Sequence, residues 1–338
     1  MIFIKANSNV REFNQDPPDV DDNNASQANV IDLNNLTKTV NRVGVELEGF
    51  FKRSGRTRRP VGFKEDGSVQ WHGDRRFHEY YPSTSVYQRD TISGESGYYR
   101  GEVVREPKTI TETYRFMNSA YPTRANSSCG MHVHLSFKQP LSYCWLMESQ
   151  FENYLLKVLK EWGKRNLADD DYNKKMLEYR LNGNAYYCQP MKELEFSYLR
   201  ENGLSKINSA YHVNHLKVPS THCHVESVGA YKVGGFAPAT HQRWSGEDKY
   251  LMTNPDIYKF GSKSGFHKDL MGTVEFRLLP AFDSKTLAVK AFTELVGAVI
   301  KYLNSDYIKD KTEHLKSSKQ FEIIRRSRNV KRQIVTTI

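Results

Sequence analysis

Four short segments of the chain alternate polar and apolar residues in the manner of β-strands. They are residues 44–48 (Gly-Val-Glu-Leu-Glu), 102–104 (Glu-Val-Val), 131–135 (Met-His-Val-His-Leu) and 273–278 (Thr-Val-Glu-Phe-Arg-Leu). Alternate residues of a strand point to the same side of a sheet. The pattern predicts three polar pairs that each share a face, with apolar residues toward the core: Glu46 with Glu48, His132 with His134, and Glu275 with Arg277.

Helical periodicity predicts three helices between and after these strands. The first follows Pro140 and runs for about 23 residues to Trp162. The second covers residues 170–181, and the third, rich in Leu, Val and Ile, covers 287–303. Strands followed by helices of this kind predict the α+β class.

The segments around the second strand have a turn or loop composition. Asp66-Gly67-Ser68 is a turn signal, and residues 71–101 are rich in Gly, Ser, Tyr and Arg, which favours a loop or hairpin excursion. The strand that begins at Glu102 is expected to stop at Pro107, because proline cannot donate to a sheet.

Composition divides the chain into three parts. Residues 1–40 are rich in Asn, Asp, Gln and Pro and predict a flexible acidic arm. Residues 41–308 carry the periodic segments and form the expected catalytic domain, and residues 309–338 form a basic tail. The net charge is +10, so an anionic ligand such as ATP, or a nucleic acid, suits the protein as a partner.

Cysteine usage and hydropathy bear on the compartment. Four cysteines are present, none in C-x-x-C spacing, and buried free thiols in a reducing environment are the simplest interpretation. No apolar run approaches the roughly 18 residues of a membrane helix, and the first residues do not resemble a secretory leader. We therefore expect a cytoplasmic protein without a membrane partner.

The polar pairs point to metal chemistry. Carboxylates crowded on one sheet face repel one another unless a cation neutralises them. Taken singly, each pair is also compatible with a solvated strand face, and the His-x-His pair with a single zinc or iron site. Their occurrence together in one chain favours a metal-filled sheet surface.

The same segments, in the same order, resemble the amidoligase family of the glutamine synthetase and glutamate–cysteine ligase superfamily. The resemblance covers roughly residues 41–300 and is most specific in 129–136 (Cys-Gly-Met-His-Val-His-Leu-Ser) and in the Glu-x-Arg strand at 275–277. It implies a curved antiparallel sheet, or half-barrel, of the glutamine synthetase catalytic type with flanking helices. It also implies an ATP-dependent carboxylate–amine ligase with two or three Mg²⁺ ions, acting on a carboxylate and an amine substrate.

The resemblance further implies roles for individual residues. The implied metal ligands are Glu46, Glu48, Glu102, His132 and Glu275. Arg277 is implied to stabilise the transferred phosphoryl group, with Glu46 and Glu275 counted beside it as catalytic. His134 and Ser136 match positions close to the nucleotide, and Asp66 and Ser68 of the turn are counted with them.

Two functions of other classes stay open at this stage. A single-metal hydrolase or cupin-type oxygenase could use His132, His134 and Glu275, but this leaves the other glutamates idle. A nucleic-acid-binding protein could use the basic tail. The five histidines between 212 and 241 lack zinc-finger spacing and are interpreted as structural or surface residues.

Overall fold

The computed structural model describes residues 33–53, 59–138, 142, 145–146, 149–188, 190, 252–254 and 274–317. The described helices are α1 (Leu33–Thr39), α2 (Arg75–Tyr80), α3 (Thr84–Asp90), η2 (Glu95–Gly97), α4 (Ile110–Ala120), α6 (Ser149–Asn166), α7 (Tyr172–Leu181), α12 (Lys285–Leu303) and α13 (Asp306–Ser317). The described strands are β1 (Val40–Lys52), β2 (Phe63–Glu65), β3 (Tyr98–Lys108), β4 (Gly130–Phe137), β5 (Thr253–Asn254) and β6 (Val274–Pro280).

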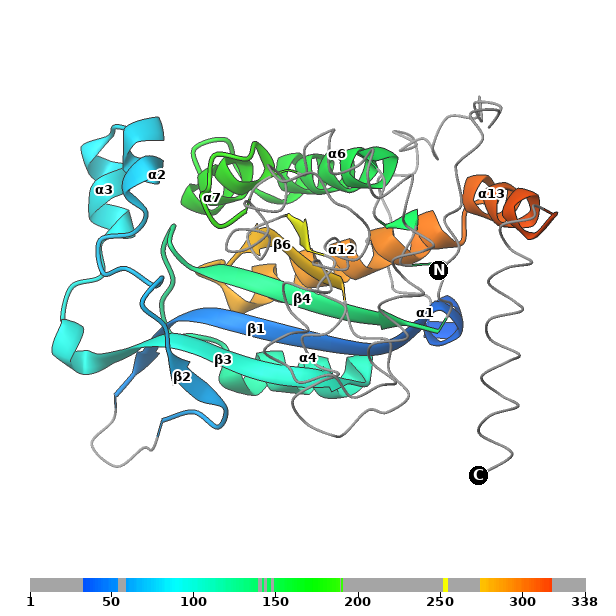
Figure 1. Cartoon of the computed structure of the whole chain (residues 1–338). Coiled ribbons are helices and arrows are strands. Elements are labelled where there is room, and N and C mark those ends of the chain that lie inside the picture. The colour runs from blue at the N-terminus through cyan, green and yellow to red at the C-terminus, as the bar shows by residue number, and fades with distance from the viewer. Residues whose placement is uncertain are drawn as a thin grey trace, which may run out of the picture.

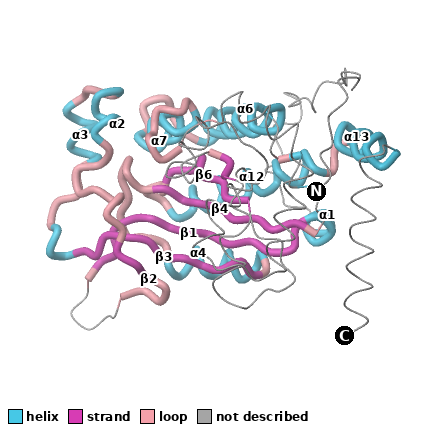
Figure 2. The backbone as a smooth tube through the Cα atoms, in the orientation of Figure 1, coloured by secondary structure: helices cyan, strands magenta, loops and turns pink. Residues whose placement is uncertain are grey.

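These strands form one open antiparallel sheet in the order β2-β3-β1-β4-β6-β5 (Figures 1 and 2). The long strand β1 lies inside the sheet between β3 and β4, although both follow it in sequence. The α+β class expected from the sequence is confirmed. None of the helices that the structure describes is both long and apolar enough to cross a membrane.

Helices cover the apolar face of the sheet. In Figure 1, α4 and α12 lie behind the strands, and α6 runs beside α12. Val45 and Leu47 of β1, with Val133 of β4, belong to the main hydrophobic core on this side. The Thr113 hydroxyl of α4 donates a 2.9 Å hydrogen bond to the Val43 carbonyl, which ties the helix to β1. The residues between these apolar positions point to the opposite face of the sheet.

The expected helices are present with shifted ends. The first is described from Ser149 and continues past Trp162 to Asn166, and the second is α7, capped by the Asp171 side chain on the Asn173 N–H. The third, α12, begins two residues early at Lys285, because Ser284 caps it through the Leu287 N–H.

The expectations for residues 71–108 were partly wrong. Residues 71–101 contain the short helices α2 and α3 before β3 begins. Strand β3 also passes through Pro107. The register shifts between the Val45–Arg105 and Val43–Lys108 pairs, so β3 carries one extra residue there. Such a bulge is where a strand tolerates a proline without losing a ladder hydrogen bond.

The folded part extends beyond the expected domain at both ends. Helix α1 lies within the expected arm, and its Leu36 is buried in the main core. Helix α13 takes in the start of the expected tail, since Tyr307 and Ile308 are buried and anchor it. Residues 1–32 and 318–338 lie outside the described residues, as do the five histidines of 212–241.

Candidate metal centre

The sheet register brings the predicted polar residues together on the face away from α4 and α12. Six of them lie directly opposite one another on neighbouring strands, where side chains on one face come within about 5 Å at Cβ. The opposed pairs are Glu48 with Glu102, Glu46 with His132, and His134 with Glu275. Four adjacent strands, β3, β1, β4 and β6, therefore contribute to one polar patch, as the alternation predicts.

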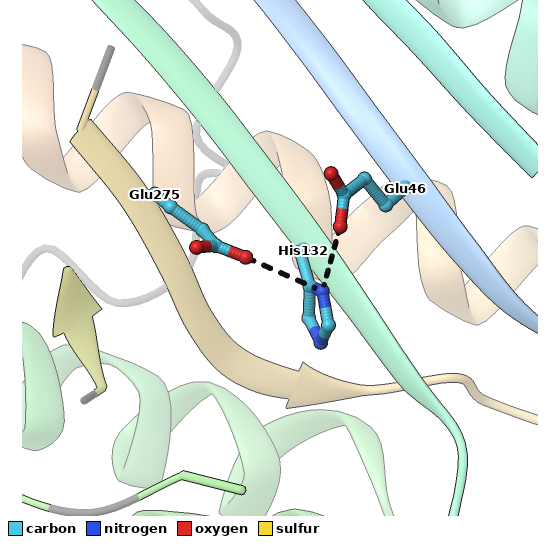
Figure 3. Close-up of side chains that lie close together, drawn as sticks. All are labelled: Glu46, His132 and Glu275. Atoms are coloured by element: carbon cyan, nitrogen blue, oxygen red, sulfur yellow. Dashed lines mark hydrogen bonds and ion pairs between the residues drawn. The ribbon is translucent and has the colours of Figure 1, made fainter. Parts of the chain in front are cut away.

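The first cluster in this patch consists of Glu46, His132 and Glu275 (Figure 3). The His132 Nδ1 atom lies 3.1 Å from Glu46 Oε2 and 3.4 Å from Glu275 Oε1. All three side chains are buried, and each offers one ligand atom within 4.8 Å of the others. His134 adjoins the cluster, with its Nε2 atom 3.3 Å from Glu46 Oε1.

The charge state of His132 fits a bound cation. Burial and the Arg277 charge lower the pKa of the imidazole to about 4, so the ring is neutral near pH 7. A neutral ring has one N–H and one lone pair. Its Nδ1 faces two carboxylates, and its Nε2, which has no hydrogen-bond partner among the described residues, lies 3.8 Å from Glu48 Oε1. Whichever nitrogen carries the proton, the lone pair on the other nitrogen therefore faces a carboxylate, and the two repel each other. A metal ion between them would be coordinated by both.

A second cluster, Glu48, Asp66 and Glu102, lies beside the first toward the β2 edge. Its candidate ligand atoms are also within 4.8 Å of one another. Burial raises the pKa of Glu48 to about 7, although the Arg277 and Arg180 charges oppose the rise. The Gly130 N–H donates a 2.6 Å hydrogen bond to Glu48 Oε2 and fixes that carboxylate. The three oxygen donors suit a hard divalent cation such as Mg²⁺.

Asp66 and Ser68 lie in the turn that follows β2. The turn after β2 holds Asp66, whose Oδ1 accepts a 2.8 Å hydrogen bond from the Ser68 N–H. The structure brings Asp66 close to Glu48 and Glu102, so its carboxylate could hold a metal ion, while the expected contact of Asp66 and Ser68 with a nucleotide stays a prediction. The Asp-Gly pair revealed the turn, but only the pairing of β2 with β3 shows which carboxylates it meets.

Arg277 and Ser136 lie on the same face. Arg277 Nη1 donates to Glu275 Oε1 at 2.6 Å, and its Nε donates to the Tyr187 carbonyl at 3.1 Å. Burial lowers the pKa of Arg277, but the surrounding carboxylates outweigh that effect and raise it above its usual value. Ser136 follows His134 on β4, and its buried hydroxyl has no hydrogen-bond partner in the part of the chain that the structure describes. A fixed guanidinium thus stands beside the first cluster.

Together these features form a candidate site for two divalent cations on one face of the sheet, with a buried arginine beside it. Comparisons with protein-family models, with curated proteins and with solved structures found no match to the chain. What the site does is therefore inferred from its residues.

Proposed function

We propose that the protein is an ATP- and Mg²⁺-dependent carboxylate–amine ligase of the amidoligase type. The observation that carries the proposal is the pair of carboxylate-rich clusters on one sheet face, with Arg277 in contact with Glu275. Glu46, His132 and Glu275 would hold one ion, and Glu48, Asp66 and Glu102 another. The open antiparallel sheet with helices on one face is compatible with the glutamine synthetase half-barrel that the resemblance implies.

The residues suit the chemistry of amide formation. A carboxylate cannot lose oxide to an amine directly, so its oxygen first attacks the γ-phosphorus of ATP, giving an acyl phosphate and releasing ADP. The amine then attacks the carbonyl carbon, phosphate leaves, and the nitrogen loses a proton. Bound magnesium neutralises phosphate charge. The Arg277 guanidinium would stabilise the negative charge that develops on the phosphoryl group. The Glu275 carboxylate would hold that guanidinium in place.

The single-metal alternative explains less of the site. It uses His132, His134 and Glu275 but gives no role to Glu46. It also leaves out Glu48, Asp66 and Glu102, which lie within ligand distance of one another. A nucleic-acid partner for the basic tail stays a prediction, and residues 318–338 lie outside the described part. A truncation that tests it belongs after Ser317, because an earlier cut would remove part of α13.

Hydroxylamine trapping tests the proposed reaction. The protein is incubated with ATP, Mg²⁺, hydroxylamine and a panel of amino acids and other carboxylates, and hydroxamate and phosphate are measured. We expect Arg277→Ala and Glu46→Gln to lower turnover about 100-fold or more, the usual effect of losing one charge-stabilising group. Arg165→Ala, at a half-exposed arginine paired with Glu294, is the control and should keep full activity. Unchanged turnover in Arg277→Ala would contradict the assigned role.

A further inference from the structure

Arg180 reaches the metal face from a helix rather than from the sheet. It lies in the last turn of α7, is only 3% exposed, and its Nη1 donates a 3.1 Å hydrogen bond to the Arg277 carbonyl. Helix α7 packs against β6, which brings the guanidinium to the backbone that carries Glu275 and Arg277. The ligase proposal assigns no role to Arg180.

Arg180 differs from Arg277 in having no carboxylate partner among the described residues. Arg277 is paired with Glu275, whereas no carboxylate in the described part of the chain lies within ion-pairing distance of Arg180. Burying a charged group without a counter-ion is costly, because the group loses its hydration. Such an arrangement is typical of a residue whose counter-ion arrives with a ligand.

The surroundings of Arg180 place it beside both clusters. Its charge acts on Glu48, whose Oε1 lies 3.8 Å from His132 Nε2. A Cβ atom at Gly130 would come within 3.1 Å of both Arg180 Nη atoms and 2.6 Å of His132 Nε2. The guanidinium and the imidazole therefore pack side by side against Gly130, so closely that no side chain would fit there.

We propose that Arg180 binds an oxyanion beside His132, as a second guanidinium next to the two cation sites. The planar fork of an arginine matches the paired oxygens of a phosphate or a carboxylate. The anion can come from two sources, the phosphate chain of a nucleotide or the carboxylate of a substrate. The inference does not require the ligase reaction, because any chemistry on a metal-bound oxyanion would use the residue in this way.

Calorimetry on the full chain tests the proposal with two probes, inorganic pyrophosphate and glutarate, each in saturating Mg²⁺. The variants are Arg180→Met and Arg180→Lys, with Arg165→Met as control. Binding of Mn²⁺ alone is measured on every variant. We expect Arg180→Met to weaken binding of one probe at least tenfold, and the probe affected identifies the source. Mn²⁺ affinity should be unchanged or higher, because a positive charge near Glu48 has been removed.

Three results would overturn the proposal. They are unchanged probe affinity in Arg180→Met, loss of probe and Mn²⁺ affinity together in both variants, and no binding of either probe to the wild type. If Arg180→Met does not fold, Arg180→Lys decides by the same measurements, because lysine keeps the charge but not the fork. A ligase assay that fails while Arg180-dependent binding persists would refute the reaction and leave this site standing.

Discussion

At the scale of single residues, the strand alternation predicted most of the site. Glu46, Glu48, His132, Glu275 and Arg277 are on one face because a period of two fixes the side of each residue once its strand is known. Two further members could not be assigned in this way. Asp66 lies in a turn and Arg180 at a helix end, and their places depend on how β2 pairs and where α7 packs.

The two clusters should bind metal separately. We expect about two Mn²⁺ per wild-type chain, one fewer in Asp66→Asn, and likewise one fewer in Glu275→Gln, because each variant removes a ligand from one cluster. Calorimetry or electron paramagnetic resonance of bound Mn²⁺ measures the stoichiometry. Glu294→Gln, at a buried glutamate on α12 paired with Arg165, is the matched control. Wild-type stoichiometry in Asp66→Asn would contradict its assignment as a ligand.

The two described cysteines should be inert in the native protein. Cys129 and Cys188 are free and buried, and burial raises their thiol pKa values to about 12 and about 11. Because the thiolate is the reactive form, a raised pKa makes it scarce at pH 8. We expect iodoacetamide to label both at least about 100-fold more slowly in the native than in the urea-unfolded protein. Peptide mapping measures this, and rapid native labelling of Cys129 would contradict the buried position.

At the scale of elements, a buried carboxylate organises the region that composition indicated to be a loop. Asp90, at the end of α3, accepts hydrogen bonds from the Ser127 N–H at 2.7 Å, the Ser127 hydroxyl at 2.6 Å and the Tyr172 hydroxyl, and its Oδ2 lies 2.6 Å from His78 Nε2. The network joins α2, α3 and α7 to the segment that leads into β4. Short polar helices held by such long-range contacts leave no periodic signal in a sequence.

Gly73 is required by this network. Its φ of +70° suits glycine, and a Cβ there would lie 1.6 Å from Asp90 Oδ2. We expect Gly73→Ala to lower the free energy of unfolding by about 2 kcal/mol or more, as measured by urea denaturation. Gly67→Ala is the control, because no atom of the described residues lies within 4 Å of the Cβ position there, and its stability should be close to that of wild type. Equal stability of the two variants would be incompatible with the packing around Asp90.

At the scale of the whole molecule, the two faces of the sheet differ in composition. One face is apolar and covered by α4 and α12, and the other carries the carboxylates, histidines and Arg277. The sequence indicated the two faces of each strand but not the order of the strands. That order comes from long-range pairing, such as β1 with both β3 and β4, which no local pattern specifies.

The central claim is that this face binds metal and nucleotide together, and a thermal-shift titration tests it most directly. Wild type, Glu275→Gln and the Glu294→Gln control are titrated with Mg²⁺, with a non-hydrolysable ATP analogue, and with both. We predict a stabilisation that requires both ligands, reaches about 2.7 kcal/mol at 100-fold excess over Kd, and is lost only in Glu275→Gln. No response to Mg²⁺ with nucleotide, with strong stabilisation by zinc or iron alone, would contradict the ligase and favour a single-metal enzyme.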